Sequence, residues 1–146
     1  MADDDKLSDV EREAVKQRAA ELKKQAGRKG GAKKERDRQD VLDTIEGLEG
    51  SDKEIAQMLH EVVSEIAPDL DPKTFYGFPA YAKDGKVVVF WQPASKFNTR
   101  YGTVSFDEPA QLDDGPMWPV SFAVIEMTDA VEQRIREQVR RAAPRD

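Results

Sequence analysis

The sequence predicts an α+β fold in which an antiparallel sheet of about four strands is flanked by N- and C-terminal helices on one face. Asp84-Gly85 lies between two runs of β-prone residues, and a two-residue Asp-Gly loop is typical of a β-hairpin. Apolar residues recur at helical spacing before this hairpin, after Ser51, and again behind it, after Thr128. The expected domain is therefore a set of strands between two amphipathic helices.

The composition limits the chemistry that the chain can perform. Its 146 residues can form one compact domain and a short extension. The chain contains no cysteine, which excludes disulfides and thiolate metal sites, and His60 is its single histidine. It contains no nucleophile motif and no phosphate loop. We therefore expect a binding protein and not an enzyme.

The first residues and the hydropathy pattern favour a soluble protein. The start, Met-Ala-Asp-Asp-Asp-Lys, lacks the basic and then apolar order of a signal peptide. The longest unbroken apolar run, residues 87–91, is too short to cross a bilayer. We expect a cytoplasmic monomer that makes no contact with a membrane.

Residues 1–40 differ from the rest of the chain in charge and hydrophobicity. Residues 16–38 contain ten Lys or Arg against three acidic residues. A thin apolar stripe predicts a weakly anchored helix over about residues 8–26, and the glycines that follow predict a polar linker as far as Asp40. We therefore divide the chain into a basic, partly helical or disordered extension, residues 1–40, and an α+β domain, residues 41–143.

Three helices are expected in the domain. A short helix over residues 40–48 carries apolar side chains towards the core. Ser51 and Glu54 have the spacing of a capping box, which predicts the start of a longer helix that ends at Pro68. Thr128 is placed to cap a final helix, whose C-terminal half is rich in arginine.

Four strands are expected between these helices. The hairpin comprises about residues 75–82 and 86–91, and Pro79 predicts that the first of these strands is bent or lies at an edge. Strands over residues 96–106 and 120–127 complete the sheet, and the proline-rich segment between them is expected to be a loop.

The hairpin and its flanks also carry a family resemblance. The segment Pro68-Asp-Leu-Asp-Pro-Lys-Thr-Phe-Tyr-Gly-Phe-Pro-Ala-Tyr81 is followed by Gly85-Lys-Val, Phe90 and Lys96-Phe-Asn-Thr-Arg-Tyr-Gly. Over about residues 47–142, this pattern resembles the YdhG-like domain-of-unknown-function family, some members of which are described as frataxin-like iron chaperones. Phe78 stands where relatives typically have methionine. The resemblance implies a frataxin-like α+β sandwich and a role in delivering iron to an acceptor protein.

Five acidic residues are candidates for weak binding of Fe(II), since hard oxygen ligands suit such a cation. The five are Glu54, Glu61, Glu65, Asp69 and Asp71. The three glutamates share one face of the predicted helix, and the two aspartates follow its end. His60 points about 100° away from Glu61 and is not included. The alternative is a solvated helix face that is followed by ordinary turn residues.

A second candidate is a ligand-binding groove on the sheet face that the helices leave open. Its predicted residues are Tyr76, Tyr81, Trp91, Lys96, Arg100, Tyr101 and Trp118. Lys96 and Arg100 alternate with aromatic residues and would suit an anionic ligand. The alternative is that most of these rings belong to the core, because aromatic side chains dominate burial in small domains.

A third candidate is the basic extension, which could tether the domain to nucleic acid or to an acidic partner. Its phosphate-contacting residues would be Lys23, Lys24, Arg28, Lys29, Lys33 and Lys34. Aromatic residues for base stacking are absent from this segment, so binding to nucleic acid would be nonspecific and sensitive to salt. The alternative is a disordered, solvating tail.

Overall fold

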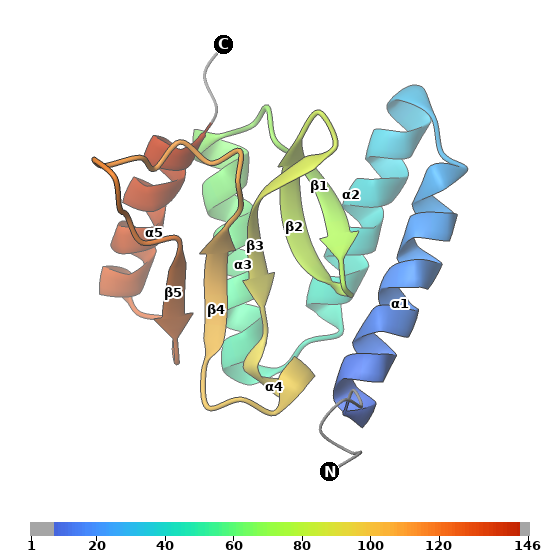
Figure 1. Ribbon diagram of the computed structural model, residues 1–146, viewed down its shortest axis with the longest axis horizontal. Coiled ribbons are helices and arrows are strands. Elements are labelled where there is room, and N and C mark those ends of the chain that lie inside the picture. The colour runs from blue at the N-terminus through green and yellow to red at the C-terminus, as the bar shows by residue number, and fades with distance from the viewer. Residues whose placement is uncertain (1–7, 144–146) are drawn as a thin grey trace.

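The computed structural model describes residues 8–143 and confirms the α+β class (Figure 1). The helices are α1 (Asp9–Ala26), α2 (Gly30–Glu46), α3 (Gly50–Ile66), α4 (Ala94–Phe97) and α5 (Asp129–Ala142). The strands are β1 (Asp71–Phe75), β2 (Phe78–Lys83), β3 (Lys86–Gln92), β4 (Gly102–Phe106) and β5 (Ser121–Val124). Within the described part of the chain, none of the helices has both the length and the apolarity that crossing a membrane requires.

The five strands form one antiparallel sheet in the order β1-β2-β3-β4-β5, so every strand pairs with its neighbours in the sequence. The prediction of about four strands missed β1. Tyr76 and Gly77 have φ values of 53° and 80°, and they form a two-residue turn in which Phe75 lies opposite Phe78. The strand predicted over residues 75–82 therefore contains the last residue of β1, this turn and most of β2.

The second hairpin lies where the sequence predicts it, with Asp84-Gly85 as the turn between β2 and β3. β2 is an internal strand and not an edge strand, and a register irregularity between Tyr81 and Ala82 interrupts its pairing with β3. The third predicted strand is shorter than expected, because α4 precedes it and β4 begins only at Gly102. β5 is likewise shorter than the predicted fourth strand.

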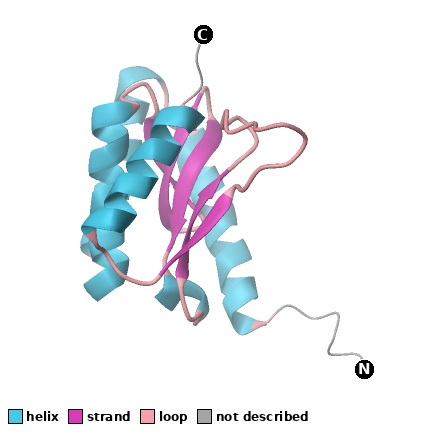
Figure 2. Cartoon of the chain, turned by 90° about the vertical axis from the view of Figure 1, so that its left-hand side faces the viewer, coloured by secondary structure: helices cyan, strands magenta, loops and turns pink. Residues whose placement is uncertain are grey.

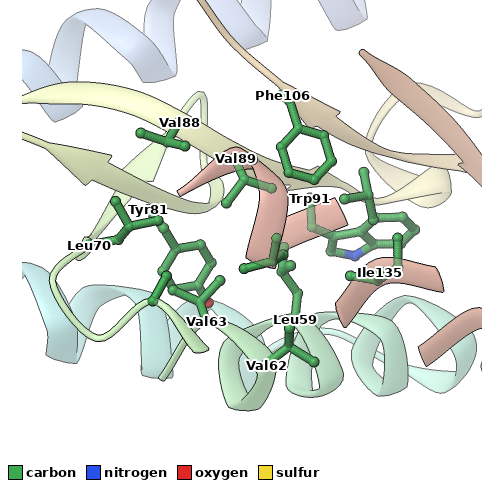
Figure 3. Close-up of a cluster of buried hydrophobic side chains, with 14 of the residues drawn as sticks. Leu59, Val62, Val63, Leu70, Tyr81, Val88, Val89, Trp91, Phe106 and Ile135 are labelled. Carbon is green, nitrogen blue, oxygen red and sulfur yellow. The ribbon is translucent and has the colours of Figure 1, made fainter. Parts of the chain in front are cut away.

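The main core lies between the sheet and the helices α3 and α5. Figure 3 shows Leu59 and Val62 of α3 below Tyr81 and Trp91 of the sheet, and Ile135 of α5 beside them. The edge view in Figure 2 shows helices on both sides of the sheet, and the helix that follows the N-terminus, α1, lies on the side opposite to most of the others. The second face of the sheet is therefore partly covered by α1.

The segment predicted to be a linker before Asp40 is helical, so that prediction is wrong. α2 runs through it, and the expected boundary between residues 40 and 41 falls inside this helix. Arg28 lies 2.6 Å from one carboxylate oxygen each of Asp37 and Asp40, and Lys33 lies 2.6 Å from the second oxygen of Asp37. These ion pairs join the α1–α2 turn to α2, and a hydrophobicity pattern cannot reveal them.

The predicted capping box is also wrong. α3 begins at Gly50, and no side chain caps its first residues. The carboxylate of Asp52, inside the first turn, instead accepts hydrogen bonds from the backbone amides of Ala94 and Ser95, at 3.2 and 3.3 Å. At the other end of the domain, the prediction for Thr128 is confirmed, because its hydroxyl accepts from the amide of Val131 at 3.1 Å.

Candidate functional site

An apolar groove of about 410 Å³ lies between α1 and the sheet face that is opposite the main core. Its lining residues are Glu11, Ala14, Val15, Phe75, Tyr76, Phe78, Phe90, Gln92 and Phe97. They come from α1, the β1–β2 hairpin, β3 and α4. Segments that are distant in the sequence therefore meet here around a hydrophobic surface.

The strand register explains why the aromatic rings gather on this face. Phe75 lies opposite Phe78, and Ala80, two residues further along β2, lies opposite Phe90. Residues two apart in a strand share a face, so the three phenylalanines belong to one surface. Trp91, the neighbour of Phe90, points to the opposite face and is completely buried in the core.

The rings form a continuous aromatic floor. The ring centroids of Phe78 and Phe90 lie 5.6 Å apart in a stacked arrangement, and Phe75 is tilted against Phe90 at 5.3 Å. Tyr76 meets the edge of Phe75 at 4.7 Å. These distances lie in the range of favourable aromatic pairs, so the rings support one another without being buried in the main core.

Polar contacts from α1 define one rim of the groove. The guanidinium of Arg18 lies 4.8 Å from the ring centroid of Phe75 and 5.6 Å from that of Tyr76, while also pairing with Glu21 at 3.2 Å. Glu21 accepts a hydrogen bond from the backbone amide of Gly77. The second half of α1, which contains Arg18 and Glu21, is therefore positioned over the β1–β2 turn by these charged side chains.

Lys96 provides a cation close to the groove. It precedes the lining residue Phe97 in α4, and its Nζ donates a hydrogen bond to the side-chain oxygen of Gln17. Burial lowers the pKa of Lys96, and the charges of Glu21 and Glu13 oppose this effect. A partly desolvated ammonium group gains free energy when an anion approaches it.

Of the seven residues predicted for a ligand groove, only Tyr76 lines it. Tyr81 and Trp91 have no exposed surface and face the main core. Trp118 packs against that core from outside, and Tyr101 lies under the guanidinium of Arg100 at 5.2 Å, on the loop before β4. The predicted set is therefore divided between the core, the groove and a distant loop.

Sequence reasoning missed three phenylalanines of the groove, which are Phe75, Phe78 and Phe90. Strict alternation in Val89-Phe90-Trp91 indicates that the two large rings of β3 point to opposite faces. That signal was available. The position of Phe75 and Phe78 was not, because it depends on the unexpected turn at Tyr76-Gly77.

The five acidic residues do not form a metal site with one another. Glu65 pairs with Arg136 at 2.7 Å, and Asp71 lies 3.9 Å from Lys34. Glu54, Glu61 and Asp69 are exposed. Among residues 8–143, no three Asp, Glu or His side chains are close enough to hold a metal ion together.

His60, the single histidine, contacts a tyrosine of the main core. Nδ1 of His60 lies 2.9 Å from the hydroxyl oxygen of Tyr81, which is buried in the core. Burial lowers the pKa of His60 and the charge of Arg38 lowers it further, while Glu61 opposes both. Burial also raises the pKa of Tyr81, so its hydroxyl stays protonated. This pair joins α3 to β2.

The six basic residues proposed for nucleic acid are distributed over the α1–α2 turn. Lys23, Lys24 and Lys29 are exposed, although Lys24 lies 3.4 Å from Asp40. Arg28 is almost fully buried in its ion pairs with aspartates, so it offers little charge to a partner. Lys33 and Lys34 stand at the start of α2, on a separate cavity.

Comparison of the chain with known protein families, with curated proteins and with solved structures found no match. The functional interpretation therefore depends on the geometry of the sites. The aromatic groove offers an apolar surface, with the cations of Arg18 and Lys96 close to it. Such a surface is suited to binding an apolar group, since most of its lining side chains are aromatic or aliphatic.

Proposed function

We propose that the protein is a ligand-binding module and that it holds a small molecule with a flat apolar body in the groove between α1 and the sheet. The observation that carries this proposal is the gathering of the half-buried Phe75, Tyr76, Phe90 and Phe97 around the buried Phe78 in one groove. Its volume of about 410 Å³ lies within the ordinary range of small-molecule pockets. An anionic substituent on the ligand would be attracted by Lys96.

The expected affinity is modest. A bicyclic aromatic group that buries about 150 Å² would gain about 4 kcal/mol from apolar contact, before the entropy of association is subtracted. Even before that cost is subtracted, a gain of this size corresponds only to a Kd on the order of 1 mM, so apolar contact alone cannot hold a ligand tightly. The physiological ligand is therefore expected to add a charged contact, and Arg18, whose guanidinium lies over the rings of Phe75 and Tyr76, and Lys96 are the cations that can supply one.

The role in iron delivery that the YdhG resemblance implies stays a prediction. It is a weaker candidate than ligand binding, because no three metal-ligating side chains meet anywhere among residues 8–143. The tether to nucleic acid also stays a prediction, and the ion pairs of Arg28 reduce the charge that the α1–α2 turn presents.

The test is an NMR titration of the full-length protein with 2-naphthoate, an aromatic carboxylate. Val15, on the α1 wall of the groove, is 54% exposed, so Val15→Gln should leave the fold intact while introducing a polar amide into the site. Leu22 lies on the same helix and is 50% exposed, but it is not among the lining residues, which makes Leu22→Gln the matched control. We expect Val15→Gln to weaken binding at least threefold and Leu22→Gln to leave it unchanged. Equal affinities in the two variants, or no saturable binding to the wild-type protein, would reject the proposal.

A further inference from the structure

A second cavity, of about 450 Å³, lies where the start of α2 faces β1 and the β2–β3 turn. Its lining residues are Gly30, Gly31, Lys33, Lys34, Asp37, Asp71, Pro72, Lys73, Ala82 and Gly85. None of them lines the aromatic groove. Any ligand of this cavity would therefore be recognised by a different set of side chains.

Three lysines and two aspartates face this cavity, and both aspartates lie within ion-pair distance of a basic side chain. Both oxygens of Asp37 are taken, one by Arg28 and one by Lys33, at 2.6 Å each. Asp71 reaches only Lys34, at 3.9 Å. Lys73 has no ion pair and no side-chain hydrogen bond with any residue of the described chain. The cavity therefore contains one cation that makes no direct ion pair with another residue of the described chain.

The surroundings of Lys73 make its charge costly in the unliganded protein. Burial lowers the pKa of Lys73, and the charges of Arg18 and Lys33 lower it further, against weaker effects of Asp37 and Glu21. An anion in the cavity would reverse this balance, because an opposite charge favours the protonated form of a lysine. The strand β1 holds this side chain at the cavity, so binding an anion would require little rearrangement.

The backbone at the start of α2 is open on the same side. A Cβ atom added at Gly30 or Gly31 would meet nothing within 4 Å, and the preceding residue, Lys29, makes no side-chain cap. The first amides of a helix lack partners within the helix and attract negative charge. These amides add to the lysines but would not define a site without them.

We propose that this cavity binds the phosphate group of a small phosphorylated molecule, with Lys73, Lys33 and Lys34 as its charge partners. The volume suits a ligand of about the size of a nucleotide. A nucleic acid strand fits less well, because Lys23, Lys24 and Lys29, the exposed lysines that would track a backbone, do not line the cavity. This proposal is independent of the aromatic groove.

The test compares the binding of inorganic pyrophosphate to the full-length protein and to two variants, using amide NMR shifts. Lys73→Gln removes the charge of Lys73, and since that charge is costly in the free protein, the variant should fold normally. Lys86→Gln is the matched control, because Lys86 is exposed at the start of β3, which is separated from β1 by β2, and does not line the cavity. We expect Lys73→Gln to raise the Kd about tenfold and Lys86→Gln to change it less than twofold. The largest amide shifts should fall at Gly30 and Gly31.

Two results would overturn the proposal. One is an equal loss of affinity in both variants, with shifts spread over Lys23, Lys24 and Lys29, which would indicate nonspecific attraction. The other is tighter binding of a single-stranded oligonucleotide that Lys73→Gln does not weaken. A titration of Lys73→Gln with 2-naphthoate separates this proposal from that of the aromatic groove. Lys73→Gln should leave the affinity for 2-naphthoate unchanged, whereas Val15→Gln should weaken it.

Discussion

Gln25 on α1 donates hydrogen bonds from Nε2 to the backbone oxygen of Thr74, at 3.1 Å, and to the hydroxyl oxygen of the same residue, at 3.2 Å. Both residues are buried. Thr74 belongs to β1, the edge strand, whose outer backbone groups have no strand partner. The side-chain amide of Gln25 therefore provides a hydrogen-bond donor for the backbone oxygen of Thr74 at the sheet edge. It also anchors α1, the wall of the aromatic groove, to the domain.

We predict that Gln25→Leu destabilises the docking of α1 by about 1–3 kcal/mol, because it leaves the buried oxygens of Thr74 without a donor. Hydrogen exchange measured by mass spectrometry should become faster across residues 9–26 while the amides of β3 stay protected. Gln39→Leu is the control, since Gln39 is exposed and bonds only Asp43, one turn further along α2. Unchanged exchange in α1 of Gln25→Leu would contradict the role assigned to this contact.

The close approach of Gly102 to Trp91 gives a second prediction. A Cβ atom at Gly102 would lie 2.2 Å from the Trp91 ring and 2.8 Å from the backbone oxygen of Gln92, and the ring is fully buried. Gly102→Ala should therefore lower the free energy of unfolding by about 1–3 kcal/mol or more in a urea titration. A Cβ atom at Gly47 would have its nearest neighbour 3.6 Å away, so Gly47→Ala should change the free energy of unfolding by less than about 1 kcal/mol. Equal stability of the two variants would be inconsistent with this packing.

The third prediction concerns pH. Since burial and Arg38 lower the pKa of His60 in the folded protein, the unfolded chain binds the proton more tightly. The contribution of His60 to stability should be constant above a pH of about 6.5, the ordinary value for histidine, and should fall as the pH decreases from there to the folded-state pKa. The imidazole of this single histidine can be titrated directly by NMR, and His60→Gln should remove its share of the pH dependence. A pKa at or above the ordinary value would contradict the buried environment.

The two hairpin turns illustrate how far the sequence predicts the fold. Asp84-Gly85 is a turn of the favoured chemistry, and the second of its residues is a glycine with a φ of 82°. Tyr76 adopts a φ of 53°, which is uncommon for a residue with a large side chain, so the turn before β2 had no local signal except Gly77. Missing that turn concealed β1 and half of the aromatic floor.

The helix α2 was missed for a different reason. Its charged residues and the glycines before it have the composition of a linker, and only the folded chain brings Arg28 to Asp37 and Asp40. Ion pairs between residues nine and twelve positions apart have no periodic signature. The same limit applies to the cavity at Lys73, whose charge partners come from two elements. Amphipathic periodicity, by contrast, was sufficient for α3 and α5.

The most direct test of the proposed function is the detection of intermolecular nuclear Overhauser effects between 2-naphthoate and the wild-type protein with its aromatic rings assigned. The proposal predicts contacts from the naphthalene protons to the rings of Phe75, Phe78, Phe90 and Phe97 and to the methyl groups of Val15, which together enclose the groove. Contacts that lie elsewhere, or none at a ligand concentration of about 5 mM, would contradict the assignment of this surface as a ligand-binding site.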